Sequence, residues 1–253
     1  MTERPDSFFI GWAPPPRRLR GFLIAVVLGL LALFALTSYL TAATQDDPGD
    51  GAFRFDWGRE TVVGVLQAEP YPVLHVLESE RFGQGQALML SGFGKRGVQD
   101  RGDPLDGKVV EASGVALKRG ALDMLQVRGG AEGLGPLEGR EAPLPPVVSL
   151  GRWRITGEIC DGKCYAGAMR PGQGLAHKAC ANLCLIGGVP PVFVATDDIE
   201  GQRFFLLADA EGGAVTEAIL DQTATLVEIE GEVTRRGALF VFNIDPQTIR
   251  LAQ

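Results

Sequence analysis

The sequence predicts an all-β protein on a membrane tether, with two tandem barrels after a single N-terminal transmembrane helix. Three observations lead to this prediction. An uncharged apolar segment lies near the N-terminus, the remainder contains two related copies of one strand pattern, and the second copy carries a cysteine-rich insertion.

The apolar segment, residues 21–44, contains no charged side chain. At about 1.5 Å per residue, a helix of this length crosses the hydrocarbon core of a bilayer. Arg17, Arg18 and Arg20 precede it and acidic residues follow it, so the positive-inside rule places residues 1–20 in the cytoplasm. We therefore expect a single-pass protein of a bacterial inner membrane with its C-terminal domains in the periplasm. A cleaved signal peptide is the alternative, although the apolar run is longer than usual for one.

The charge of the chain bears on its partners. The net charge is −7, and it becomes −9 without residues 1–20, which hold four basic and two acidic side chains. Such an acidic surface argues against binding to nucleic acid. The bilayer, through residues 21–44, and a membrane protein complex are the partners that we expect.

Two parts of the chain repeat each other. Residues 114–127 align without gaps on residues 231–244, and residues 63–66 match residues 156–159. Within Val227–Val233 apolar residues or glycine alternate with glutamates, which is the pattern of a half-buried strand. An Arg-Gly pair in each copy predicts the tight turn that joins two strands.

The order of elements in the second copy resembles an oligonucleotide/oligosaccharide-binding (OB) fold, which has three strands, a helix and two strands. The first copy has five expected strands and no clear helix. A pair of β-meanders or one mixed sandwich is the alternative. The expected strands of the second copy are 153–159, 192–196, 203–208, 225–234 and 238–244, with a helix at about 214–221, and those of the first are 61–67, 72–77, 86–91, 108–117 and 121–127.

These elements divide the chain into consecutive parts. A glycine-rich and then proline-rich stretch between the copies predicts an interdomain linker. The expected parts are a cytoplasmic tail (1–20), the transmembrane helix (21–44), a linker (45–58), a first OB-like domain (59–128), a Gly/Pro linker (129–150) and a second OB-like domain (151–253) with a Cys-rich insertion (160–191).

The insertion follows from the lengths of the two copies. Gly64 and Gly114 lie 50 residues apart, whereas the matching Gly157 and Gly231 lie 74 apart, so the second copy is longer by 24. Connections of this length inside a compact domain are usually functional. Leu175–Ile186 has helical propensity and ends at two glycines, as a helix often does.

The cysteines of the insertion allow three interpretations. His177, Cys180 and Cys184 share one helix face, so that with Cys164 they are candidate ligands for zinc or copper. In an oxidising compartment two nested disulfides, Cys160 to Cys184 and Cys164 to Cys180, compete with this metal site. A reversible dithiol or a haem-related role is the third interpretation.

The insertion also resembles a pattern of uncharacterised exported bacterial proteins. Its elements are Cys, His-x-x-Cys-x-x-x-Cys and Gly-Gly-x-Pro-Pro, carried here by Cys164, His177, Cys180, Cys184 and residues 187–191. The resemblance implies that these cysteines and the histidine recur, and that Cys160 is an extra one. It implies no established activity.

The sequence contains none of the usual catalytic constellations. A P-loop, a dinucleotide-binding glycine motif and a compelling Ser-His-Asp set are all absent from it. We therefore expect a non-catalytic accessory protein, either a metal-handling or redox/assembly partner of an envelope oxidoreductase, or an interaction module that disulfides merely staple.

Overall fold

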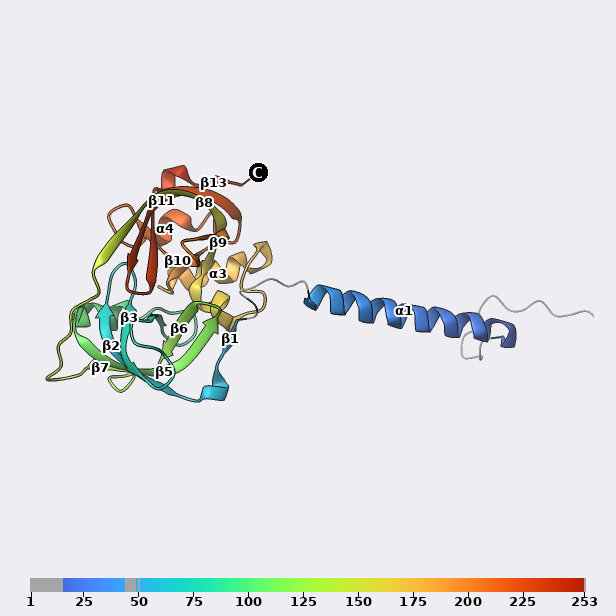
Figure 1. The fold of residues 1–253 in the computed structure, drawn as a ribbon, viewed down its shortest axis with the longest axis horizontal. Helices are drawn as coiled ribbons and strands as arrows, with labels where there is room; N and C mark the ends of the chain where they lie inside the picture. The colour runs from blue at the N-terminus through green and yellow to red at the C-terminus, as the bar shows by residue number, and fades with distance from the viewer. Residues whose placement is uncertain (1–15, 44–48, 50, 253) are drawn as a thin grey trace, which may run out of the picture. The chain divides into compact units, whose positions relative to one another are not determined.

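Figure 1 shows the fold in a computed structural model that describes residues 16–43, 49 and 51–252. The chain divides into two units, one up to Asp47 and one from Pro48 onward. Most of the expected cytoplasmic tail, residues 1–15, and residues 45–48 and 50 of the expected first linker lie outside the described residues.

The first unit contains helix α1, Arg17–Ala43. It is long and apolar enough to cross a membrane, and none of its residues is buried against protein. A signal sequence near an N-terminus has the same properties. The expected segment 21–44 thus forms a helix apart from residue 44, which lies outside the described residues, and the helix begins four residues earlier than expected.

The first sheet contains a closed barrel of five strands. Strand β5 pairs antiparallel with both β2 and β6, and β4 pairs parallel with β6, so the ring closes in the order β2-β3-β4-β6-β5. Its interior holds one apolar core that includes Leu66, Leu90 and Leu125. The strands are β2 (Glu60–Gln67), β3 (Val73–Ser79), β4 (Ala87–Ser91), β5 (Val109–Arg119) and β6 (Leu122–Val127), with two short strands, β1 (Ala52–Phe53) and β7 (Leu134–Pro136), on β5.

The second sheet follows the same order of pairings. Strand β11 pairs antiparallel with both β8 and β12, and β10 pairs parallel with β12. A separate apolar core that includes Ile229 and Phe242 lies against this sheet. The strands are β8 (Val147–Asp161), β9 (Pro191–Ile199), β10 (Gln202–Asp209), β11 (Leu226–Arg236), β12 (Leu239–Ile244) and β13 (Arg250–Leu251).

The registers of the two sheets agree with the sequence alignment. Gly114 pairs with Val127 in the first sheet, and Gly231 with Ile244 in the second. On their other sides these two glycines pair with Glu60 and Trp153. A Cβ at Gly114 would come within 2.1 Å of a backbone oxygen on β6, and one at Gly231 within 2.3 Å of a backbone oxygen on β12, which accounts for glycine at both places.

Short helices connect the strands. Between β4 and β5 lie α2 and a 3₁₀ turn, where the sequence predicts no clear helix, and α4 occupies the expected helical position between β10 and β11. Their bounds are α2 (Gln99–Gly102), η2 (Asp103–Leu105) and α4 (Thr216–Ile219), and the remaining 3₁₀ turns outside the insertion are η1 (Phe55–Trp57) and η5 (Pro246–Thr248).

The two sheets pack against each other through a shared apolar cluster. Leu117 and Met124 of the first sheet meet Val192, Phe204 and Leu206 of the second. The stretch expected as a Gly/Pro linker supplies β7 and the first residues of β8. The described residues from Gly51 to Ala252 accordingly belong to one compact unit, which includes the long connection between β8 and β9.

Candidate metal centre

The connection between β8 and β9 carries three helical segments. Cys164 begins the turn η3 (Cys164–Ala168), three residues after β8 ends. The 3₁₀ turn η4 (Leu175–His177) then leads directly into α3 (Lys178–Ile186), where the sequence predicts one helix. Cys180 and Cys184 lie four residues apart and therefore on the same face of α3.

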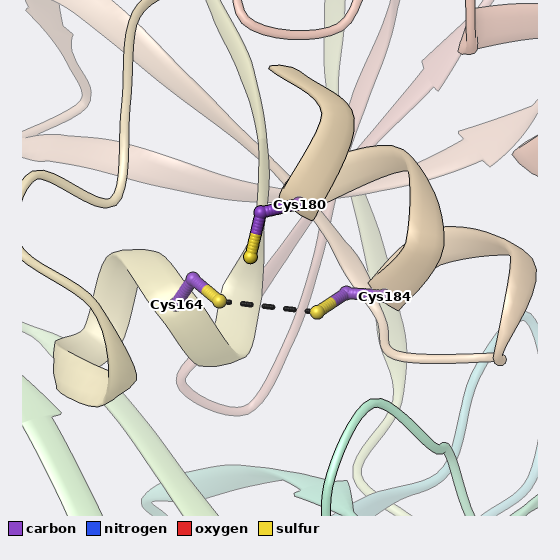
Figure 2. A group of neighbouring side chains, drawn as sticks. All are labelled: Cys164, Cys180 and Cys184. Atoms are coloured by element: carbon purple, nitrogen blue, oxygen red, sulfur yellow. Dashed lines mark hydrogen bonds between the residues drawn. The ribbon is translucent and has the colours of Figure 1, made fainter. Parts of the chain in front are cut away.

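This arrangement brings three sulfur atoms together (Figure 2). The Sγ atoms of Cys164, Cys180 and Cys184 lie within 4.8 Å of one another, and those of Cys164 and Cys184 are 3.8 Å apart. Cys164 and Cys184 are almost fully buried, whereas Cys180 is partly exposed. We call these three residues the sulfur cluster.

The two buried thiols of the cluster have unequal pKa values. Their mutual hydrogen bond, together with burial, raises the pKa of Cys164, whereas the hydrogen bond from Cys164 lowers the pKa of Cys184. One partner of such a pair keeps its proton while the other releases it. Cys184 is thus the buried sulfur that first becomes a thiolate, the form that binds metal ions.

A lysine from the first sheet reaches the cluster. Lys95 lies in the loop Gly92–Gly97, between β4 and α2, and its Nζ donates hydrogen bonds to Cys180 Sγ at 2.6 Å and Cys184 Sγ at 3.7 Å. The contact with Cys180 raises the pKa of Lys95, because the ammonium is stabilised beside sulfur. The sequence gives no signal for this contact, since the two residues are 85 positions apart.

The 92–97 loop is fixed by contacts with the insertion. The Nζ of Lys163 is buried and donates to the carbonyl oxygens of Gly92 and Gly94, at 2.6 and 2.7 Å. The backbone N–H of Gly97 donates to the carbonyl of Gly187, at 2.7 Å, just beyond α3. The insertion therefore holds the loop that carries Lys95 in a defined position beside the sulfur cluster.

His177 and Asp161 form a buried pair beside the cluster. His177 Nε2 lies 3.1 Å from Asp161 Oδ2, and the N–H of Cys164 donates to Asp161 Oδ1 at 2.8 Å. Ligand atoms of Asp161, Cys164 and His177 also lie within 4.8 Å of one another. The four expected ligands are thus distributed over two groups that share Cys164, and Asp161 is a member that sequence reasoning missed.

Cys160 lies outside both groups. Its side chain is buried in the apolar cluster between the two sheets, where its Sγ donates a hydrogen bond to Glu158 Oε1 at 3.6 Å. Burial raises the pKa of this thiol, so that it stays protonated. All four cysteines are free thiols in the structure.

Chemically, the sulfur cluster fits a soft or borderline metal ion. A metal ion bound at about 2.3 Å from each sulfur holds its sulfur ligands about 3.8–4.0 Å apart, and the Cys164–Cys184 separation of 3.8 Å matches this. Soft thiolates favour zinc and monovalent copper over hard cations.

Comparisons with known protein families, with curated proteins and with solved structures found no match for this chain.

Proposed function

We propose that this protein is a membrane-anchored metal-handling protein, with the sulfur cluster of Cys164, Cys180 and Cys184 as its binding site. The single observation that carries the proposal is the convergence of three sulfur atoms within 4.8 Å of one another. The buried pair of Asp161 and His177 supports it, because hydrogen-bonded carboxylate and imidazole groups commonly orient metal ligands.

The proposed location of the site follows from the apolar helix near the N-terminus. Helix α1 would anchor the protein in a bacterial inner membrane, with the sulfur cluster on the periplasmic side. There the protein would serve as an accessory partner of an envelope oxidoreductase complex. An anchor raises the effective concentration of a protein near other membrane proteins, so weak contacts with such a complex would suffice.

The scaffold proposed for the site is a pair of OB-like barrels, with the cysteine-bearing connection inserted into the second. The matching order of strand pairings supports this, as do the matching registers at Gly114 and Gly231. The corresponding connection in the first sheet, between Gln67 and Val73, is a short turn. The proposed metal site would thus lie in a segment of the second copy that has no counterpart in the first.

Metal titration of the full-length protein in mild detergent, under anaerobic reducing conditions, tests the proposal. We expect one equivalent of Zn²⁺ or Cu⁺ to bind, and Cys180→Ser to lower its affinity by about tenfold or more. Cys160→Ser is the matched control, because Cys160 lies in the same segment but outside the sulfur cluster. Neither ion binding at this stoichiometry, or equal effects of the two variants, would contradict the proposed function.

A further inference from the structure

If the sulfur cluster is a metal site, as the proposed function has it, its ligands and neighbours determine which ion it selects. Zinc in structural sites has four ligands in tetrahedral geometry. The sulfur cluster supplies three. The selectivity of the site therefore depends on what stands at the fourth position.

Neither Asp161 nor His177 has a ligand atom within 4.8 Å of all three sulfur atoms, so neither completes the sulfur cluster. Asp161 uses Oδ1 to accept from the Cys164 N–H and Oδ2 for its contact with His177. That contact engages the Nε2 of His177, and Cys160 lies in the apolar cluster between the sheets. None of these three side chains therefore occupies the fourth position beside the sulfur cluster.

Lys95 is the group that lies against the sulfur atoms instead. Its Nζ is 2.6 Å from Cys180 Sγ and 3.7 Å from Cys184 Sγ. An ammonium group has three donors and no acceptor, so it cannot ligate a metal ion. It compensates the negative charge of thiolates, and it repels a divalent ion more strongly than a monovalent one.

The 92–97 loop, which carries Lys95, packs closely against the C-terminal end of α3. A Cβ at Gly187 would lie 1.8 Å from the carbonyl oxygen of Lys95, and a Cβ at Gly97 would lie 2.0 Å from that of Gly188. Gln99 Nε2 adds a hydrogen bond to the same Gly188 carbonyl at 2.7 Å. These contacts hold Lys95 over the cluster from the side of the first sheet.

We propose that the cluster binds monovalent copper through three thiolates, and that Lys95 closes the fourth position and so discriminates against zinc. Monovalent copper is a soft ion that favours thiolate ligands, and three of them satisfy it. Lys95 is a positioning and selectivity residue here, since it touches the ligands and not the ion. On binding, three Cu–S bonds form, the S–H bonds of the protonated thiols break and their protons pass to solvent, while copper stays monovalent.

The experiment compares Cu⁺ and Zn²⁺ affinities of the full-length protein, measured anaerobically in detergent by competition with chromogenic chelators. Lys95→Cys offers a fourth thiolate and should raise the zinc affinity about tenfold or more, while the copper affinity changes little. Lys95→Met, which leaves room for water, should shift the copper-to-zinc affinity ratio toward zinc by about tenfold. Arg96→Met removes the same charge from the next residue of the loop and should leave that ratio unchanged.

X-ray absorption of the copper-loaded wild type gives an independent readout, for which we expect three sulfur neighbours and no fourth ligand. A fourth ligand there, or an unchanged affinity ratio in both Lys95 variants, would overturn the inference while leaving the proposed function intact. Failure of the wild type to bind either ion would instead overturn the proposed function. The two failures are therefore distinguishable.

Discussion

A single carboxylate, Asp161, organises the buried side of the candidate site. It accepts a hydrogen bond from the N–H of Cys164, three residues later, as a helix-capping aspartate does. It also contacts His177 at 3.1 Å. Asp161 and His177 are both nearly inaccessible to solvent, so each satisfies a polar group of the other that would otherwise be costly to bury.

His75 is a buried histidine outside the candidate site, and it should make the stability of the protein depend on pH. Its side chain is 2% exposed, with Nε2 2.9 Å from Gln67 Oε1, and burial lowers its pKa from 6.5 to about 4. In the unfolded chain the imidazole binds a proton below about pH 6.5, whereas in the folded protein it stays neutral down to about pH 4. The stabilising effect is therefore complete above pH 6.5 and is lost as the pH falls toward 4.

We expect this histidine to account for up to about 3 kcal/mol of the stability lost between pH 7.5 and pH 4.5, at about 1.4 kcal/mol per pKa unit. Thermal unfolding of the full-length protein in detergent at the two pH values measures the loss. His75→Gln, which has no titrating group, should lose less on acidification than the wild type. An equal loss in both proteins would show that His75 does not titrate in this range.

At the scale of elements, the 92–97 loop depends on one buried ammonium. Lys163 Nζ donates to the carbonyls of Gly92 and Gly94, and its burial lowers the pKa of the lysine. Lys163→Met removes both hydrogen bonds and leaves the carbonyl groups without this donor. It also removes the cost of burying a charge, so we expect a net loss of only about 1–2 kcal/mol.

Hydrogen exchange of the loop amides measures this effect, and exchange in residues 92–98 should become faster in Lys163→Met. Lys108→Met is the matched control, because Lys108 Nζ donates to the carbonyl of Pro104 at an exposed position. Faster exchange across the whole second unit in Lys163→Met would indicate global destabilisation and would contradict a local role for the lysine.

The elements themselves were largely predictable from the sequence. Alternation and glycine-marked turns are local signals, and each of the ten main strands begins within two residues of its expected start, except β8. Strand β8 begins six residues early, at Val147, because it continues along β11 through residues that composition marks as a linker. The short strands β1 and β7 carry no periodic pattern, so only their pairing with β5 identifies them.

The candidate site was predictable only in part, because local sequence patterns do not reveal contacts between distant segments. The i, i+4 spacing of Cys180 and Cys184 places them on one helix face, and this is visible in the sequence. The approach of Lys95 depends on how the first sheet packs against the insertion, which no local pattern encodes. The contact between His177 and Asp161 likewise depends on tertiary structure, because Asp161 is the last residue of β8.

At the scale of the whole molecule, we expect the apolar cluster between the sheets to couple their unfolding. Leu206 is 1% exposed in this cluster, and it packs there with residues of the first sheet. Each sheet also has a core of its own. Because the two sheets share buried surface, each stabilises the other, and they should unfold in one cooperative transition.

Two tryptophans can report this coupling separately, since Trp57 packs on the core of the first sheet and Trp153 on that of the second. In full-length variants that keep only one of them, with every other Trp changed to Phe, we expect the same Tm by fluorescence. Leu206→Ala opens a cavity between the sheets and should cost about 2–5 kcal/mol, or roughly 2–4 °C in Tm per kcal/mol. Because its neighbours belong to both sheets, both reporters should move together. A lower Tm at Trp153 with an unchanged Tm at Trp57 would show that the two sheets unfold as independent domains.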